Sequence, residues 1–160
     1  MSPLDWIIEP LRRYTDFSGR SRRREFWWFM LVYWAILLAL MAAVFAAFPW
    51  NALEGRGDDL QSLVDAFQTP LMLVSLSALG LFYIGTYIPY VALVIRRLHD
   101  RNMSGWWYGA ALILSWIPFL SLLSFLLYPI IFVIMWLSGT NGPNRFGPDP
   151  KDPSQAAVFE

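Results

Sequence analysis

Arginine is the residue type in this sequence best suited to specific chemistry, and the arginines gather in two short segments. Nine of the twelve basic residues lie within residues 1–25 and 96–105. Guanidinium groups hold phosphates and carboxylates through paired hydrogen bonds, and they stay charged at any cellular pH. We therefore predict a basic face that binds an anion, either a phosphate-bearing lipid or an acidic partner. The residues of this predicted face are Arg22, Arg23, Arg24, Arg96, Arg97 and Arg101.

Two carboxylates and one histidine accompany these arginines. Glu25 and Asp100 lie inside the basic segments, and we expect them to form ion pairs that lock two helices together. His99 is the only histidine in the chain, and we interpret it as a residue of an interfacial loop bonded to backbone or headgroup. The alternative role is pH sensing, because histidine titrates near neutrality.

Several kinds of site are not expected from this sequence. One histidine and no cysteine cannot build the usual zinc or iron site, and cysteine nucleophiles and disulfides are excluded. The chain contains neither a nucleophile-elbow motif nor a glycine-rich phosphate or dinucleotide loop. We therefore predict no catalytic residues, no metal and no cofactor, and we do not expect an enzyme. Nucleic acid is not expected as a partner either, since the net charge is zero and the basic run is short.

The composition points to a bilayer. Of the 160 residues, 57% are hydrophobic, 18% are aromatic and only 15% are charged, whereas soluble domains carry about 25% charged residues. Nine Trp, twelve Phe and seven Tyr would leave large apolar patches on a soluble protein of this size. Because helices satisfy their own backbone hydrogen bonds in lipid, we predict an all-α integral membrane protein.

The charge-free runs predict a transmembrane domain over residues 26–137, with three to four transmembrane helices. A 23-residue run from Phe26 would cover about 34 Å as a helix, enough to span the bilayer. Residues 106–137 would cover about 48 Å as one helix, and Pro118 lies near their middle. We favour two short, hairpinned spans here over one long kinked span. The four favoured spans cover residues of about 26–48, 70–95, 106–117 and 120–137.

The polar segments predict the orientation. Segments 1–25 and 96–105 each carry a net charge of +2, whereas segment 51–69 carries −3. The positive-inside rule then places the N-terminus in the cytoplasm and the acidic loop outside. Apolar residues at helical spacing in 3–17 indicate an interfacial helix, although an irregular leader is the alternative. Residues 138–160 form a polar tail rich in Pro and Gly, and its side depends on the number of spans. The expected interface anchors are Trp27, Trp28, Trp106 and Trp107.

Three motifs in order resemble the domain-of-unknown-function family 805 of small bacterial inner-membrane proteins. They are FSGRSRRREFWWF (17–29), IRRLHDRNMSGWW (95–107) and GTNGPNRFGPDP (139–150), and the similarity covers nearly the whole chain. The family commonly has a glycine and a basic residue where Asn102 and Met103 stand here. The resemblance implies a multi-pass protein of the bacterial inner membrane and points to no particular activity.

These features favour a small accessory or scaffold protein. Its expected partners are anionic membrane lipids, a larger membrane complex, or further copies of itself in a homo-oligomer. The alternative is an oligomeric channel or a small transporter. Against that alternative, the predicted spans carry no ionisable residue between their ends, and such residues usually mark ion paths.

Overall fold

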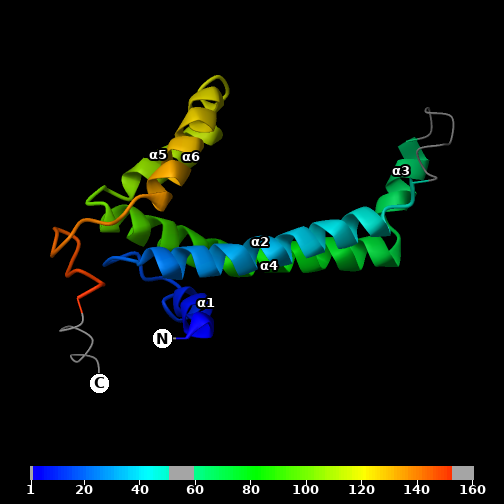
Figure 1. Cartoon of the computed structure of the whole chain (residues 1–160). Coiled ribbons are helices and arrows are strands. Elements are labelled where there is room, and N and C mark those ends of the chain that lie inside the picture. The colour runs from blue at the N-terminus through cyan, green and yellow to red at the C-terminus, as the bar shows by residue number, and fades with distance from the viewer. Residues whose placement is uncertain (1, 51–59, 153–160) are drawn as a thin grey trace. The chain divides into compact units, whose positions relative to one another are not determined.

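The computed structural model describes residues 2–50 and 60–152, and the regular secondary structure in this part is helical (Figure 1). This confirms the predicted all-α class for the described residues, where an isolated bridge between Asn144 and Gly147 is the one β-type pairing. The helices are α1 (Pro3–Arg12), α2 (Arg23–Ala47), α3 (Leu60–Phe67), α4 (Pro70–Asp100), α5 (Trp106–Ser115) and α6 (Ser121–Trp136).

Two of these helices are long and apolar enough to cross a bilayer. They are α2, with 25 residues, and α4, with 31 residues, which correspond to about 37 Å and about 46 Å. α2 begins three residues before the predicted span, so that Arg23 and Arg24 occupy its first turn. Each helix exceeds the bilayer core of about 30 Å.

The C-terminal end of α4 corrects one expectation. The sequence predicted a loop from residue 96, but the helix continues to Asp100. Arginine and leucine favour helix, and the chain turns away only after Asp100, at Asn102, which adopts the left-handed conformation with φ 59°. The Asn102 and Met103 amides donate back to the carbonyls of His99 and Leu98, as in a Schellman motif. The polar side chains from Arg96 to Asp100 therefore project from a rigid helix.

The chain divides into two compact units. The terminal unit comprises Met1–Met30 with Ile88–Glu160, and the middle unit comprises Leu31–Tyr87. In the middle unit, the rings of Tyr33 on α2 and Phe82 on α4 lie 5.4 Å apart. Its outer side chains are apolar and exposed, as shown by Leu38 at 65% and Leu81 at 72%. Such a surface suits lipid better than water.

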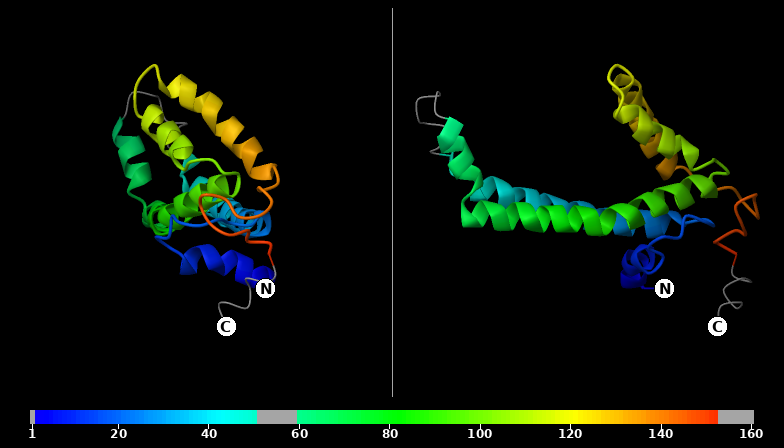
Figure 2. Two further views of the ribbon diagram at one scale, coloured as in Figure 1. Left: turned by 90° about the vertical axis from the view of Figure 1, so that its left-hand side faces the viewer. Right: turned by 180° about the vertical axis from the view of Figure 1, so that it is seen from behind.

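In the terminal unit, α5 and α6 pack side by side as a hairpin (Figure 2). At 10 and 16 residues they cover about 15 Å and about 24 Å, less than the bilayer core. The connecting turn contains Phe119 with a φ of 66°. The hairpin predicted for residues 106–137 is thus observed as a pair of helices, each shorter than the range expected for it.

The two ends of the chain also join the terminal unit. α1 opens with a capping box between Ser2 and Asp5 and buries Trp6, and it ends at Arg12, within the stretch predicted as helix. After α6, the tail passes the C-terminal end of α4, where the Thr140 amide donates to the Asp100 carbonyl at 2.9 Å (Figure 1). Among the largest fully buried side chains are two arginines, Arg96 and Arg97.

Candidate functional site

Arginines of the terminal unit surround the C-terminal end of α6. The last carbonyls of a helix lack partners within the helix, and they carry the negative end of its dipole. Here three arginines donate hydrogen bonds to four successive carbonyls. Arg97 bonds the carbonyls of Met135 and Leu137, Arg23 bonds that of Trp136, and Arg101 bonds that of Ser138.

Asp100 lies at the centre of this arrangement. Its Oδ1 accepts from Arg20 Nε at 3.0 Å, and its Oδ2 forms an ion pair with Arg97. All three side chains are buried. Arg20 also donates to the carbonyls of Thr140, at 2.6 Å, and Gly142, at 2.7 Å. Arg20, Arg23, Arg97, Arg101 and Asp100 together are called the arginine cluster below.

Backbone groups of α4 bind the tail next to the cluster. The hydroxyl of Thr140 donates to the Asp100 carbonyl, and the side-chain amide of Asn144 donates to the His99 carbonyl at 2.9 Å. A Cβ atom on Gly139 would overlap the Asp100 carboxylate, so glycine is required there by close approach. The tail is therefore fixed against the end of α4 by side-chain and backbone contacts together.

A second buried ion pair joins α2 to α4. Arg96 Nη2 lies 3.4 Å from Glu25 Oε1, and both side chains are almost fully buried. Arg96 also donates to the carbonyls of Arg13, at 3.4 Å, and Asp16, at 3.2 Å. These bonds connect the end of α4 with the start of α2 and with the segment that follows α1.

Asp16 holds that segment in shape. Its carboxylate accepts from the Arg13 guanidinium and from the hydroxyl and amide of Ser18. Partial burial raises the pKa of Asp16, but hydrogen bonds from Ser18 and Arg13 outweigh this effect, and the pKa falls to about 2. Asp16 is therefore charged at neutral pH, and the turn it stabilises presents its carbonyl to Arg96.

The arginine cluster carries more positive than negative charge. Arg20 and Arg97 form ion pairs with Asp100, whereas in the described part of the chain Arg23 and Arg101 form none. The charges of Arg23 and Arg101 also repel that of Arg97. The Nε atoms of Arg96 and Arg101 are buried and donate no hydrogen bond within the described residues. The excess of positive charge in the arginine cluster attracts anions.

The structure divides the six arginines that the sequence assigned to one face. Arg96 and Arg97 are fully buried, because they bond to carboxylates and backbone carbonyls within the protein. Arg22 is half-buried, with its guanidinium 5.7 Å from the Trp6 ring centre. Arg23 and Arg24 are exposed, and Arg101 is half-buried. Anion binding by the accessible members stays a prediction.

His99 lies on the last turn of α4 rather than in a loop. Its ring stacks on that of Phe146 with centroids 3.9 Å apart, and its Nδ1 lies 3.1 Å from the Gly19 carbonyl. Nδ1 must carry the proton to donate to this oxygen. His99 thus helps to hold the tail and residue 19 together, and the pH-sensing role stays a prediction.

The tryptophans expected at the membrane interface are mostly exposed. Trp28 is 39% exposed, Trp106 75% and Trp107 53%. Trp27 is half-buried, because its ring packs at 4.2 Å against that of Trp136 on α6. These rings can serve as anchors, although their depth in a bilayer stays a prediction.

Sequence reasoning missed Arg20 and the tail residues that it binds. Arg20 belongs to the same basic run as Arg22, so its residue type was visible, but its partners lie 80 or more residues away. The signal in the tail is the glycine-rich stretch from Gly139 to Gly142, which suits close backbone approach. No cluster of three or more potential metal ligands occurs within residues 2–50 and 60–152.

The described residues define an all-helical protein with two helices long and apolar enough to cross a bilayer, joined to a helical hairpin through buried arginines. Residues 14–148 match the family model described as "Protein of unknown function (DUF805)", so the chain belongs to that family. The predicted family resemblance is thereby confirmed.

Two relatives from Escherichia coli (strain K12) are similar over nearly their full lengths. Inner membrane protein YhaI is 31% identical over 148 residues, which cover 92% of this chain and 97% of the relative. Inner membrane protein YhaH is 33% identical over 148 residues, which cover 92% of this chain and 98% of the relative. No solved structure matches this chain.

Proposed function

We propose that this protein is a non-enzymatic accessory or scaffold protein of the bacterial inner membrane, which binds anionic lipid through a basic cytoplasmic face. The face consists of Arg23, Arg24 and Arg101 with Arg145, an exposed tail residue that donates to the Asn102 carbonyl at 3.1 Å. The location follows the names of the two relatives, both of which are called inner membrane proteins. The orientation follows the charge of the polar segments, because basic residues beside a span stay in the cytoplasm.

The proposed topology has two crossings, α2 and α4, and a re-entrant hairpin of α5 and α6. It differs from the four spans favoured on sequence, because α5 covers only about 15 Å. The hairpin turn supports insertion into lipid, since Trp116 is 87% exposed and Phe119 96% exposed. The Thr140 amide in the tail bonds to the Asp100 carbonyl, close in sequence to the start of α5. A re-entrant hairpin is consistent with this bond, because its two ends lie on the same side of the bilayer.

The excess of arginine over carboxylate at the end of α6 is the observation that carries the proposal. Four arginines contact one carboxylate or the neighbouring carbonyls, and two of them lack an ion pair in the described part of the chain. Arg23 and Arg24 also occupy the first turn of α2, where the helix dipole disfavours positive charge. An external anion would neutralise the arginines that lack an ion pair, and it would offset the repulsion between the α2 dipole and the positive charges in its first turn.

The test is lipid selectivity of the full chain in nanodiscs. The protein should enrich phosphatidylglycerol over phosphatidylcholine in its bound lipid. Arg23→Gln combined with Arg24→Gln should weaken this preference by about tenfold or more, because each basic residue near an anionic surface contributes about 1 kcal/mol. Arg23→Lys with Arg24→Lys is the matched control, which keeps the charge and should retain most of the preference.

Two results would contradict the proposal. One is an unchanged lipid preference in the double Gln variant at both low and high salt. The other is the loss of an acidic protein partner from detergent extracts of that variant while its bound lipid stays the same. The second result would assign the face to a protein complex instead of lipid.

A further inference from the structure

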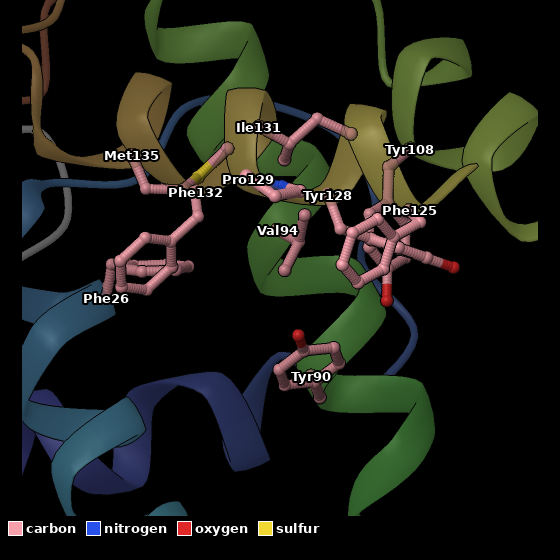
Figure 3. Close-up of a pocket in the computed structure, with 10 residues that line it drawn as sticks. All are labelled: Phe26, Tyr90, Val94, Tyr108, Phe125, Tyr128, Pro129, Ile131, Phe132 and Met135. Atoms are coloured by element: carbon pink, nitrogen blue, oxygen red, sulfur yellow. The ribbon is translucent and has the colours of Figure 1, made fainter. Parts of the chain in front are cut away.

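An apolar pocket of about 460 Å³ lies within the terminal unit, between the start of α2, the end of α4, α5 and α6 (Figure 3). Its volume falls within the range of about 300–1,000 Å³ that is typical of ligand sites. Its lining is apolar and aromatic throughout. The lining residues from α6 include Phe125, Tyr128, Phe132 and Met135, and those from other helices include Phe26 and Tyr108.

The pocket is open on the side formed by α6. Phe125 is 70% exposed and Phe132 is 53% exposed, although both line it. The rings of Tyr90 on α4, Tyr108 on α5 and Tyr128 on α6 form a row across the pocket, with centroid distances of 6.4 Å and 6.2 Å between neighbours. Figure 3 shows the Tyr90 ring rising from α4 toward α6. A flexible apolar chain could enter from the open side and lie along these rings.

One end of the pocket adjoins a positive charge. Phe26 lines the pocket, and Arg23 precedes it by one helical turn on the same face of α2. The Arg23 guanidinium donates to the Trp136 carbonyl, next to Met135, which also lines the pocket. The end near Phe125 has no such neighbour among the lining residues, which are uncharged. The site is therefore basic at one end and apolar along its length.

We propose that this pocket binds one acyl chain of an anionic phospholipid, whose phosphate contacts Arg23. From Met135 to Phe125, α6 rises by about 15 Å, so an extended chain can follow it away from the charged end. Charge complementarity selects an anionic headgroup, and the aromatic lining selects the chain. The proposal rests on the lipid-binding function above and adds to it a defined place for a chain.

The experiment uses the full chain in nanodiscs that contain phosphatidylglycerol with a diazirine near the end of one acyl chain. After illumination, the labelled peptides should contain Tyr108 or residues 125–128, which line the end of the pocket away from Arg23. Phe125→Ala should lower labelling there by about fivefold, because the acyl chain loses its apolar contact with the Phe125 ring and binds the pocket less tightly. Leu126→Ala is the matched control, since Leu126 is 57% exposed on the same helix but does not line the pocket.

The headgroup contact is tested with a second pair of variants and a second probe. Arg23→Gln should lower labelling by the anionic probe about fivefold, whereas Arg24→Gln should lower it less. A phosphatidylcholine probe with the same chains should label the pocket weakly and should not respond to Arg23→Gln. Free phosphate in excess should not displace the anionic probe, because it lacks the chain.

Several outcomes would overturn the pocket proposal. Labelling spread evenly over the exposed apolar helices would show that the chain is ordinary surrounding lipid. Equal labelling by both probes, or equal effects of Phe125→Ala and Leu126→Ala, would also reject it. If the protein still enriches phosphatidylglycerol in these cases, the proposal of a lipid-binding face holds and only the pocket proposal is rejected. If enrichment is absent as well, both proposals fail.

Discussion

Replacing Asp100 by Asn should release the tail from the rest of the terminal unit. The carboxylate is 1% exposed and pairs with both Arg20 and Arg97. The amide has a similar shape but no charge, so two buried guanidinium groups would lose their shared counter-ion. Breaking a buried pair by removing one partner costs about 3–5 kcal/mol. A loss of about 3 kcal/mol raises the population of the opened state about 100-fold.

Hydrogen exchange of the tail in mild detergent measures this opening directly. The Thr140 amide is hydrogen-bonded to the Asp100 carbonyl in the closed state, so its exchange should accelerate about 100-fold in Asp100→Asn. Asp65→Asn is the matched control, because Asp65 is an exposed carboxylate on α3, and its exchange pattern in the tail should be unchanged. Equal exchange in the Asp100 variant and the parent would show that the backbone carbonyls alone satisfy the arginines.

Three further predictions concern other parts of the terminal unit. Gly139→Ala should lower the thermal midpoint of unfolding, because the new Cβ would overlap the Asp100 carboxylate. Gly80→Ala is the control and should leave the midpoint unchanged, since nothing lies near its Cβ position. Differential scanning fluorimetry of both variants tests this. Asp16 has a pKa lowered to about 2 from 3.8, so its stabilising effect is present above pH 4 and is lost as the pH falls toward 2. The thermal midpoints of parent and Asp16→Asn should therefore differ modestly at pH 6 and converge near pH 2, and a constant difference would contradict this reasoning. Single cysteines at Asn102 and Asn141, both exposed, should react with an impermeant reagent only after the cells are opened, and labelling of Asn141 on intact cells would reject the re-entrant hairpin.

The helices were predictable because their signal is local. Long runs without charge marked α2 and α4, and Pro118 marked the break between α5 and α6. The boundaries were less predictable, since the charges of residues 96–100 suggested a loop outside the span, although arginine and leucine favour helix. There the decisive residue is Asn102, whose left-handed conformation closes the helix one turn later than hydropathy suggested.

The candidate site was less predictable, because its contacts join residues that are distant in the sequence. The sequence identified Asp100 as an ion-pair partner for an arginine, but it could not show which arginines reach it or that the pairs are buried. It also could not show that the partners of Arg20 are carbonyls of the tail, because backbone acceptors are present at every residue. A motif can specify donors, but the fold determines which acceptors reach them.

The arginine cluster can serve structure and binding together because its members differ in exposure. Arg97 is fully buried, and its guanidinium donates to the Met135 and Leu137 carbonyls and to the Asp100 carboxylate. It therefore holds the end of α6 and is not accessible to a ligand. Arg23 is exposed and donates one bond to a carbonyl at 3.3 Å, which leaves most of its donors to solvent or to a ligand. Arg97 holds the end of α6 against the end of α4 within the terminal unit, and Arg23 on α2 bonds the same end of α6, beside the apolar pocket. Loss of Arg97 should therefore lower lipid selectivity indirectly through the fold, whereas loss of Arg23 should lower it with the hydrogen-exchange pattern of the tail unchanged.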